Sequence, residues 1–406
     1  MKKRGVILST IIHKYGGTSI GSIEKIKSVA KKIILEKEKG NDVVVVVSAM
    51  GKTTNKLVDL AKEISSNPDK REFDVLLSTG EQISISLLAI AIKSLGYDAI
   101  SFTGYQVGIK TKGIHTKSEI DDIDTDRIKE NLEQGKIVII AGFQGINEDG
   151  DITTLGRGGS DTTAVSLAAS LGCKCVIYTD VEGIYPVDPK FYPNAKKLDY
   201  ISYKEMIEMA RLGAGVMETT SVETGYRKNV LIYVTSSSKD TKGTYITENK
   251  NTINYKPITG IAIDDNTSIL TIKNILSKSN DTSTILEILS NNNLEIKMIN
   301  EVASDDEYSN LSFIVSKGDL GCVDKAMEEI KLKINCVEVC KDLDVSTISV
   351  VSKDINYNVI NKIFNILKKD NIEFKQVFTS ELSISFIVDN KYKQRFIELL
   401  GSEFNL

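Results

Sequence analysis

The sequence is poor in the residues that build zinc centres and disulfide frameworks. It contains only two histidines and five cysteines in 406 residues. Because the cysteine count is odd and the spacing is not that of a secreted framework, a disulfide-stabilised fold is not expected. A His/Cys zinc site is not expected either, and we expect His13 and His115 to be structural or exposed residues.

Long apolar runs and an excess of positive charge are also missing. No apolar stretch reaches the ~18 residues of a membrane-spanning helix, so no membrane partner is predicted. The start, MKKRGVILSTII, imitates a signal peptide, but its apolar part is short, which favours a β-strand and a cytoplasmic protein. A net charge of −4 argues against a nucleic-acid-binding protein that relies on a broad basic face.

The remaining composition is typical of a globular chain with more than one domain. Hydrophobic residues make up 41% and charged residues 26% of the sequence, which argues against disorder. At roughly 100–200 residues per domain, the length of 406 residues predicts two to three domains.

The first 235 or so residues alternate between strand and helix patterns. Ser22 is a candidate N-cap of the first helix, and Gly40 lies beyond its end. The run VVVVV is typical of a strand buried on both faces, as in a parallel sheet. We therefore predict an α/β domain over 1–247, with a mostly parallel sheet sandwiched by helices. The predicted strands are 6–12, 43–47, 136–143 and 173–180, and the predicted helices are 23–35, 81–95 and 162–171.

The character of the chain changes after residue 235, and a polar boundary is predicted near 245–257. An internal repeat follows: ILSNNNLEIKMI at 288–299 and ILKKDNIEFKQV at 366–377 are identical at five of twelve positions. Each copy reads strand, helix, strand, strand, helix, which predicts two ferredoxin-like βαββαβ units. We place them at 258–335 and 343–406, and an intertwined arrangement of the two stays open.

Two glycine-rich loops could bind phosphate. KYGGTS at 14–19 follows the first strand and precedes the first helix, so its backbone N–H groups and Lys14 could hold an anion. GRGGSD at 156–161 adds Arg157, whose planar fork suits a carboxylate or a phosphate. A plain glycine turn and a surface Arg–Asp pair are the alternatives.

Three further segments carry polar residues near predicted strand or helix ends: 48–54, 78–81 and 179–190. Glu81 is either a cap in the first turn of a helix or an acceptor for a substrate ammonium. Tyr185 could flank a base, and Lys190 could reach phosphates. Because ligands of α/β sheets bind beyond the carboxyl ends of strands, we expect all five segments to converge there. Two anion loops, a lysine, an arginine and a carboxylate suit phosphoryl transfer.

Taken in order, these motifs resemble those of the aspartokinases in the amino-acid kinase family. The resemblance covers the whole catalytic half, and the duplicated half is similar to the paired ACT domains of regulated aspartokinases. The family's G-[AS]-K-V-L-H stretch departs here, with Gly215 in place of the lysine and Glu218 in place of the histidine. The matching segments are KYGGTS, VVVVVSAMGKTTNKL, STGEQIS, GFQG, GRGGSDTTA and YTDVEGIYPVDPK.

The resemblance implies that ATP, with Mg²⁺, phosphorylates the β-carboxylate of L-aspartate. It implies catalytic roles for Lys14, which would neutralise the transferring phosphoryl group, and for Asp161, which would orient the Lys14 ammonium. The implied aspartate-binding residues are Thr54, Glu81, Phe143, Arg157 and Ser160. The implied ATP-binding residues are Lys14, Gly16, Gly17, Ser19, Thr179, Asp180, Tyr185 and Lys190.

The resemblance also implies regulation through the duplicated half. Lysine or threonine would be the effector, and a homodimer or dimer of dimers would form through the repeats. The usual Pro-Gly turns are replaced by Asn-Asp-Thr at 280–282 and Asn-Tyr-Asn at 356–358. Another amino-acid kinase, such as a glutamate kinase, and a catalytically weak amino-acid sensor are the alternative functions. The candidate effector-binding residues are Ser277, Asp281, Met298 and Asn300.

Overall fold

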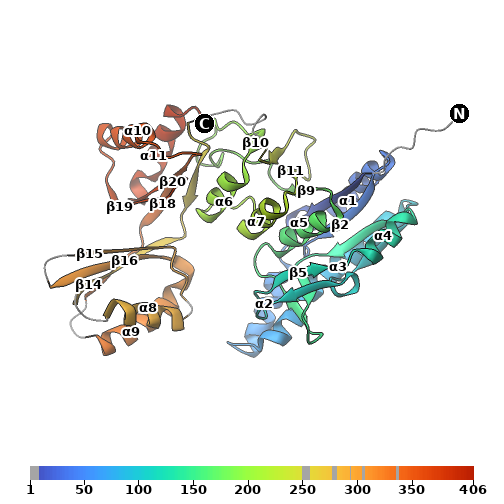
Figure 1. Cartoon of the computed structure of the whole chain (residues 1–406), viewed down its shortest axis with the longest axis horizontal. Coiled ribbons are helices and arrows are strands. Elements are labelled where there is room, and N and C mark those ends of the chain that lie inside the picture. The colour runs from blue at the N-terminus through green and yellow to red at the C-terminus, as the bar shows by residue number, and fades with distance from the viewer. Residues whose placement is uncertain (1–8, 249–256, 277–280, 293, 304–306, 335–337) are drawn as a thin grey trace. The chain divides into compact units, whose positions relative to one another are not determined.

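The computed structural model describes residues 9–248, 257–276, 281–292, 294–303, 307–334 and 338–406 (Figure 1). These residues form two compact units. The first unit contains the described residues up to 186 together with 196–211 and 215–248. The second unit contains 187–195, 212–214 and the described residues from 257 onward.

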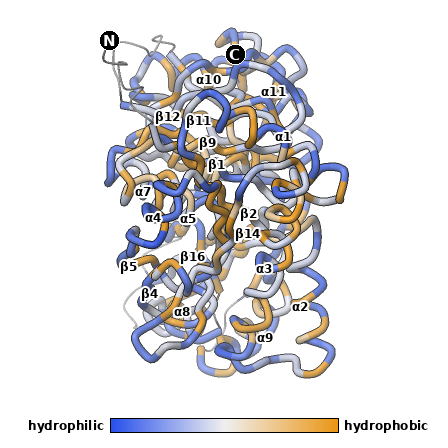
Figure 2. Tube along the Cα trace, turned by 90° about the vertical axis from the view of Figure 1, so that its right-hand side faces the viewer, coloured by the Kyte–Doolittle hydropathy of each residue, from blue (hydrophilic) through white to orange (hydrophobic). Residues whose placement is uncertain are grey.

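The first unit is built on an eight-stranded sheet in the order β10-β12-β11-β9-β1-β2-β6-β3. Neighbouring strands are parallel except that β12 runs antiparallel to β11. Every valine of 43–47 is fully buried, as a sheet covered on both faces requires, and this strand is hydrophobic in Figure 2. The strands are β1 (Thr10–Tyr15), β2 (Asp42–Val47), β3 (Ala99–Phe102), β6 (Ile137–Ala141), β9 (Lys174–Thr179), β10 (Tyr200–Ile201), β11 (Ile232–Ser236) and β12 (Thr244–Ile246).

Helices and a small second sheet complete this unit, and α1 and α3 pack on the same face of the large sheet. The second sheet has the order β5-β4-β7-β8, with β4 (Ile109–Lys112), β5 (Glu119–Ile123), β7 (Gln144–Ile146) and β8 (Ile152–Thr154). The helices are α1 (Ile23–Glu38), α2 (Thr53–Ile64), α3 (Lys70–Ser94), α4 (Asp126–Glu133), α5 (Gly159–Leu171), α6 (Tyr203–Arg211) and α7 (Thr219–Lys228), with short 3₁₀ turns η1 (Gly17–Ile20) and η2 (Tyr105–Val107).

The predicted α/β class is confirmed, and most predicted elements of this half are present. The Ser22 hydroxyl caps α1 by accepting the Lys25 N–H at 3.3 Å, and Gly40 follows the helix with a φ of 88°. The strand predicted at 6–12 begins in residues outside the described part, and its described portion runs from Thr10 to Tyr15 as β1.

The predicted start of the third helix at residue 81 is wrong. α3 begins at Lys70, where the Asp69 carboxylate accepts the Glu72 N–H at 3.1 Å, so Glu81 lies in the middle of the helix. Ser78 and Thr79 suggested a loop, but their hydroxyls donate to carbonyl oxygens of the preceding helical turn. Gly80 is explained by packing, because a Cβ there would lie 2.9 Å from the Ala49 Cβ.

α3 is long and apolar enough to cross a membrane by length and composition alone. Half of its most apolar window is buried inside the protein, and it packs with α1 against the sheet. Its buried face also carries the polar side chains of Asp74, Ser78 and Glu81. We therefore interpret α3 as a core helix of the first unit.

The second unit contains two antiparallel four-stranded sheets in the orders β15-β16-β14-β17 and β13-β18-β20-β19. Each sheet is covered by two helices, which gives two ferredoxin-like units as predicted. The first comprises β14 (Thr267–Leu276), α8 (Asp281–Asn291), β15 (Met298–Ala303), β16 (Tyr308–Ser316), η3 (Lys317–Asp319), α9 (Leu320–Lys333) and β17 (Glu338–Asp342). The second comprises β13 (Gly260–Asp264), β18 (Val345–Val351), α10 (Tyr357–Lys369), β19 (Phe374–Thr379), β20 (Ser383–Asp389) and α11 (Asn390–Glu403).

The predicted boundaries 258–335 and 343–406 need a correction. β13 pairs with β18, with Gly260 opposite Val351, so the strand that precedes the first repeat belongs to the second sheet. The fourth strand of the first sheet is instead β17, which pairs with β14. The first repeat is therefore inserted between two neighbouring strands of the second.

The predicted catalytic domain 1–247 is also interrupted. Residues 187–195 belong to the second unit, where a Cβ at Gly401 would lie 2.9 Å from the Tyr192 ring. Residues 212–214 belong there as well, and a Cβ at Gly213 would lie 2.8 Å from the Ile263 carbonyl oxygen. Both segments lie within the range that strand and helix patterns assigned to the first domain.

Candidate active site

An ion pair joins the end of β1 to the first turn of α5. Lys14 Nζ lies 2.6 Å from Asp161 Oδ1, and both side chains are nearly buried. Ile11 and Tyr15 of β1 pack with α1, so Lys14 lies on the opposite face of the strand, toward α5. Because a buried ammonium is costly without a partner, Asp161 stabilises the charge of Lys14 in this position.

The loops that follow β1 and β2 contact each other through their backbones. A Cβ at Gly17 would lie 2.6 Å from the Ala49 carbonyl oxygen, so only glycine allows this approach. The Gly51 N–H donates to the Gly17 carbonyl oxygen at 3.0 Å. Ser19 Oγ is buried and has no hydrogen-bond partner in the part of the chain that the structure describes. Such an oxygen is available to a ligand.

Glu81 lies beside the same loop. Its Oε1 accepts the Ala49 N–H at 3.0 Å, whereas its Oε2 is buried without a hydrogen-bond partner among the described residues. Burial raises the pKa of Glu81 to about 8. A cationic group placed at Oε2 would satisfy this oxygen and favour the ionised carboxylate.

Ser160 and Phe143 extend the site between α5 and the end of β6. Ser160 Oγ lies 2.7 Å from the Ser48 hydroxyl, which follows β2. A Cβ at Gly142 would lie 2.7 Å from the Ser160 Cβ, so the strand end and the helix are in close contact. Phe143 has a φ of 71°, and its N–H donates to Thr163 Oγ1 at 3.1 Å.

Two predicted aspartate-binding residues, one in a helix and one in a loop, have no described contact to Glu81. Thr54 is half-buried in the first turn of α2. Arg157 is exposed and forms no ion pair within the described ranges of the chain. The adjacent Gly158 has a φ of 64°, and a Cβ there would collide with the side chain of Glu218. The residue in place of the family's histidine therefore packs directly on the Arg157 loop.

The predicted ATP-binding residues are only partly brought together. The Gly16 N–H donates to the Tyr178 carbonyl oxygen at 3.4 Å, which places the first glycine loop beside the end of β9. Thr179 and Asp180 continue that end, with a 3.1 Å hydrogen bond between their side chains. Tyr185 is half-buried in the following loop. Lys190 belongs to the second unit, where its N–H donates to Asp188 Oδ1 at 2.9 Å.

The sequence reasoning missed a buried carboxylate near these loops. Asp74 is fully buried on α3 and accepts hydrogen bonds from Thr154 Oγ1, from the Thr116 N–H and from His115 Nδ1. One acidic residue in an amphipathic helix is typical of a solvated face, so the sequence offers no local signal for its burial. The second histidine is thus a structural partner, as predicted.

Comparisons with known proteins agree with this geometry. Residues 9–236 match the amino acid kinase family. Over 402 residues, and 98% of both chains, the sequence is 44% identical to an aspartokinase of Bacillus sp. strain MGA3 and to aspartokinase 2 of Bacillus subtilis strain 168. The chain belongs to the aspartokinases.

Solved aspartokinases share the fold of the chain. Escherichia coli aspartokinase III, crystallised with aspartate and ADP, superposes with a TM-score of 0.79 at 23% identity, covering 98% of this chain and 100% of that chain. The predicted family is confirmed for both halves of the sequence by the 44% identity to the two Bacillus enzymes, which extends over 98% of the chain.

No group of three or more His, Cys, Asp or Glu side chains that could hold a metal ion occurs in the described part of this aspartokinase chain. Mg²⁺ in kinases is commonly held by one or two carboxylates together with substrate phosphates and water. Asp161 lies in the first turn of α5, after the second glycine loop, and Asp180 follows the end of β9, so these two carboxylates fit a metal that is bound mainly through ATP.

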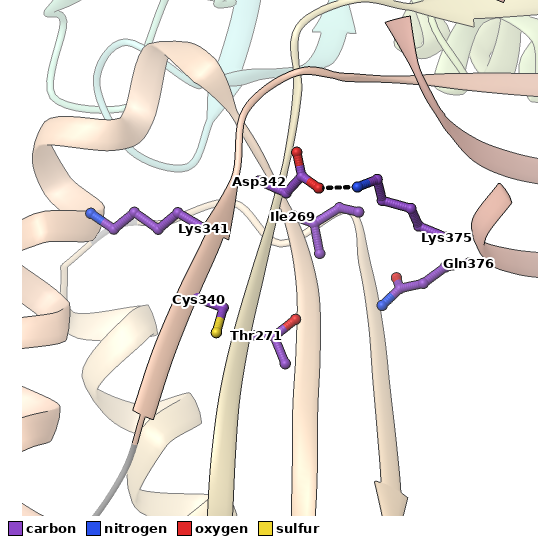
Figure 3. Close-up of a pocket in the computed structure, with 7 residues that line it drawn as sticks. All are labelled: Ile269, Thr271, Cys340, Lys341, Asp342, Lys375 and Gln376. Carbon is purple, nitrogen blue, oxygen red and sulfur yellow. Dashed lines mark ion pairs between the residues drawn. The ribbon is translucent and has the colours of Figure 1, made fainter. Parts of the chain in front are cut away.

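The duplicated half contains a cavity of about 260 Å³ between strands of its two sheets (Figure 3). The ammonium of Lys375 on β19 pairs with Asp342 on β17 across it. Gln376 Oε1 is buried without a hydrogen-bond partner among the residues that the structure describes. The cavity is lined by Ile269, Thr271, Cys340, Lys341, Asp342, Lys375 and Gln376.

The predicted effector-binding residues lie elsewhere in this half. Ser277 is outside the described residues. Asp281 begins α8, and Met298 and Asn300 lie on β15 opposite Ile314 and Ser312. None of the described three lines the 260 Å³ cavity.

Proposed function

We infer that the chain is an ATP-dependent aspartate kinase, which converts L-aspartate and ATP to 4-phospho-L-aspartate and ADP. The observation that supports this most directly is the buried Lys14–Asp161 pair beside two glycine loops, in a chain of the aspartokinase family. This reaction begins the biosynthesis of lysine, threonine and methionine, and the cytoplasm is the compartment that fits it.

The reaction needs charge neutralisation more than proton transfer. The β-carboxylate of aspartate is already ionised at neutral pH, so no general base is required. One of its oxygens forms a bond to the γ-phosphorus while the bond from that phosphorus to the bridging oxygen breaks, and ADP leaves with the electron pair. Lys14 neutralises charge on the transferring group, and Asp161 holds the Lys14 ammonium in place.

Aspartate would bind between Glu81 and Arg157. The free Oε2 of Glu81 suits the α-ammonium, and the fork of Arg157 suits the α-carboxylate. Thr54, Phe143 and Ser160 would line the rest of the site. These roles are supported by the burial of Glu81 and by the positions of the loops.

ATP would bind along the ends of β1 and β9. Gly16, Gly17 and Ser19 would contact its phosphates, and Thr179, Asp180 and Tyr185 would complete the nucleotide site. Mg²⁺ bound to the phosphates would neutralise part of their charge. A Cβ at Gly215 would meet nothing within 4 Å, so the place of the family's lysine is open space here.

The duplicated half would act as the regulatory part. We propose lysine or threonine as the effector, bound near Ser277, Asp281, Met298 and Asn300. A homodimer or a dimer of dimers would form through these units. The edge strand β15 supports this, because it exposes about half of the side chains of Ile299 and Val302.

ATP turnover measured with and without L-aspartate tests the proposed activity. We expect turnover to require L-aspartate. We also expect hydroxylamine, added as a trapping reagent, to react with the acyl phosphate product. Preference for L-glutamate would identify a different amino-acid kinase, and no turnover with either substrate would favour a sensor. Adding each end-product amino acid at sub-saturating aspartate tests regulation separately.

A further inference from the structure

The buried face of α3 carries a stripe of polar residues. Asp74, Ser78 and Glu81 follow one another at helical spacing and are 0%, 0% and 3% exposed. Glu81 faces the Ala49 loop through a hydrogen bond of 3.0 Å. Asp74, about two turns earlier on the same face, has no part in the chemistry proposed above.

Asp74 joins α3 to two other segments of the first unit. Its Oδ2 lies 2.8 Å from His115 Nδ1, and the Thr116 N–H donates to both carboxylate oxygens at 3.1 and 3.0 Å. Thr154 Oγ1, at the end of β8, donates to its Oδ1 at 2.5 Å. A buried carboxylate that accepts this many hydrogen bonds fixes its donors firmly, because each donor would otherwise be left unsatisfied.

Both segments held by Asp74 adjoin the loop that carries Arg157. Thr154 precedes Arg157 by three positions, and its carbonyl oxygen accepts the Ser118 N–H at 3.0 Å. Thr116 has a φ of 72°, a strained value for a threonine, which the hydrogen bonds to Asp74 stabilise. A Cβ at Gly156 would lie 3.2 Å from the Thr116 carbonyl oxygen, so the strained residue borders the start of the Arg157 loop.

We propose that Asp74 is a positioning residue for aspartate: it fixes the Arg157 loop relative to Glu81, which lies on the same helix. This proposal rests on the aspartate-binding roles proposed for Glu81 and Arg157. The Arg157 side chain is exposed and forms no ion pair in the described segments, so the backbone of its loop determines where it lies. Within the described part of the chain, the hydrogen bonds to Asp74 come from His115, Thr116 and Thr154, and none comes from the first glycine loop or Lys14.

The consequence is a selective effect on one substrate. Loosening the Asp74 contacts changes the spacing between the groups that hold the ammonium and the α-carboxylate of aspartate. The loops proposed for the phosphates keep their own contacts, such as that between Gly17 and Gly51. A residue that merely supports the fold would affect both substrates together.

Steady-state kinetics of Asp74→Asn test the proposal. The amide keeps the size of the side chain but places an NH₂ group against a donor. We expect KM for aspartate to rise about tenfold, while KM for ATP and kcat at saturating aspartate change by no more than about twofold. Thr154→Val should raise KM for aspartate in the same selective way, whereas Thr154→Ser keeps the hydroxyl and should behave as the wild type.

Two controls separate positioning from stability. Ser84→Ala removes a buried hydroxyl of the same helix that does not bond to Asp74. This variant should leave KM for aspartate unchanged even if its thermal unfolding midpoint falls. In the double variant Asp74→Asn/Thr154→Val, the rise in KM should be smaller than the product of the single effects, because both changes break the same contact.

The proposal fails if Asp74→Asn leaves KM for aspartate unchanged, or raises both KM values by the same factor. If Asp74→Asn does not fold, the comparison of Thr154→Val with Thr154→Ser decides instead. Arg157→Lys and Glu81→Gln test the underlying roles: if neither changes KM for aspartate, the proposed aspartate site is wrong. If they do and the Asp74 and Thr154 variants do not, only the positioning role is rejected.

Discussion

Lys14 and Asp161 form a 2.6 Å ion pair although one ends a strand and the other begins a helix far along the chain. The ammonium is nearly buried, so it is held in one place before any phosphate arrives. Such preorganisation is what makes a charge effective in a transition state.

Lys14→Ala should therefore lower kcat far more than it raises either KM. Removal of a preorganised charge that acts on the transferring group is expected to cost about 10²–10³-fold in kcat. Steady-state kinetics with both substrates varied measure this. Lys93→Ala serves as a control, because Lys93 is an exposed lysine near the end of α3 that pairs with the exposed Asp98 at 3.3 Å. A near-normal kcat for Lys14→Ala would remove Lys14 from the mechanism.

Arg157→Lys should weaken aspartate binding and spare ATP. Lysine keeps the positive charge but loses the planar fork that binds a carboxylate with two hydrogen bonds, so KM for aspartate should rise about tenfold. KM for aspartate and KM for ATP, measured separately for the wild type and Arg157→Lys, test this prediction. A main effect on ATP would instead assign Arg157 to the phosphate site.

The raised pKa of Glu81 predicts how aspartate binding depends on pH. The ammonium of aspartate needs the ionised carboxylate, whereas burial raises the pKa of Glu81 to about 8 in the free protein. Binding then requires loss of a proton, and KM for aspartate should fall by up to about tenfold per pH unit between about pH 6 and 8. In Glu81→Gln this dependence should vanish while aspartate binds weakly at every pH.

The same shift has a consequence for stability without substrate. Unfolded Glu81 titrates near its ordinary value of 4.5, so between this value and about 8 the folded state holds one proton more than the unfolded state. The free energy of unfolding should fall as pH rises through that range. Chemical denaturation of the wild type and of Glu81→Gln at several pH values measures the free energy of unfolding of each protein. The difference between the two proteins should change with pH and be largest near pH 8. Equal profiles for the two proteins would contradict the raised pKa.

Gly80→Ala should destabilise the first unit although alanine is the better helix former. Its Cβ would lie 2.9 Å from the Ala49 Cβ, so α3 must move away from the loop that Glu81 contacts. We expect a loss of about 1–3 kcal/mol in the free energy of unfolding, together with a higher KM for aspartate. Gly321→Ala is the matched control, because that helical position faces open space and should gain about 0.5–1 kcal/mol.

Local patterns were enough to predict much of the first half. Five consecutive valines indicate a strand buried on both faces, and Ser22 followed by helical spacing indicates a helix start. The glycine loops were found because their positions after strands and before helices are legible in sequence. The Lys14–Asp161 contact follows from placing both loops at one edge of the sheet.

Features that depend on packing could not be predicted in the same way. The hydroxyls of Ser78 and Thr79 donate to carbonyl oxygens of their own helix, and Gly80 packs against the Ala49 loop. Because these three residues are weak helix formers, the sequence alone predicts a loop where the structure has the middle of α3. Asp74 resembles a surface charge until its donors from two distant segments are known. The pairing of β13 with β18 could not be predicted, because the hydrophobic periodicity of a strand does not indicate which sheet the strand joins.

The insertion of the first repeat between β13 and β18 has a consequence for the order of folding. The first repeat is continuous in sequence, and its first and last strands are neighbours, with Ile269 opposite Asp342. Folding of the first repeat therefore brings β13 and β18 together. It removes most of the entropy cost of closing the long loop between these two strands. Hydrogen exchange during refolding should accordingly protect the amides of β14 and β16 before those of β13.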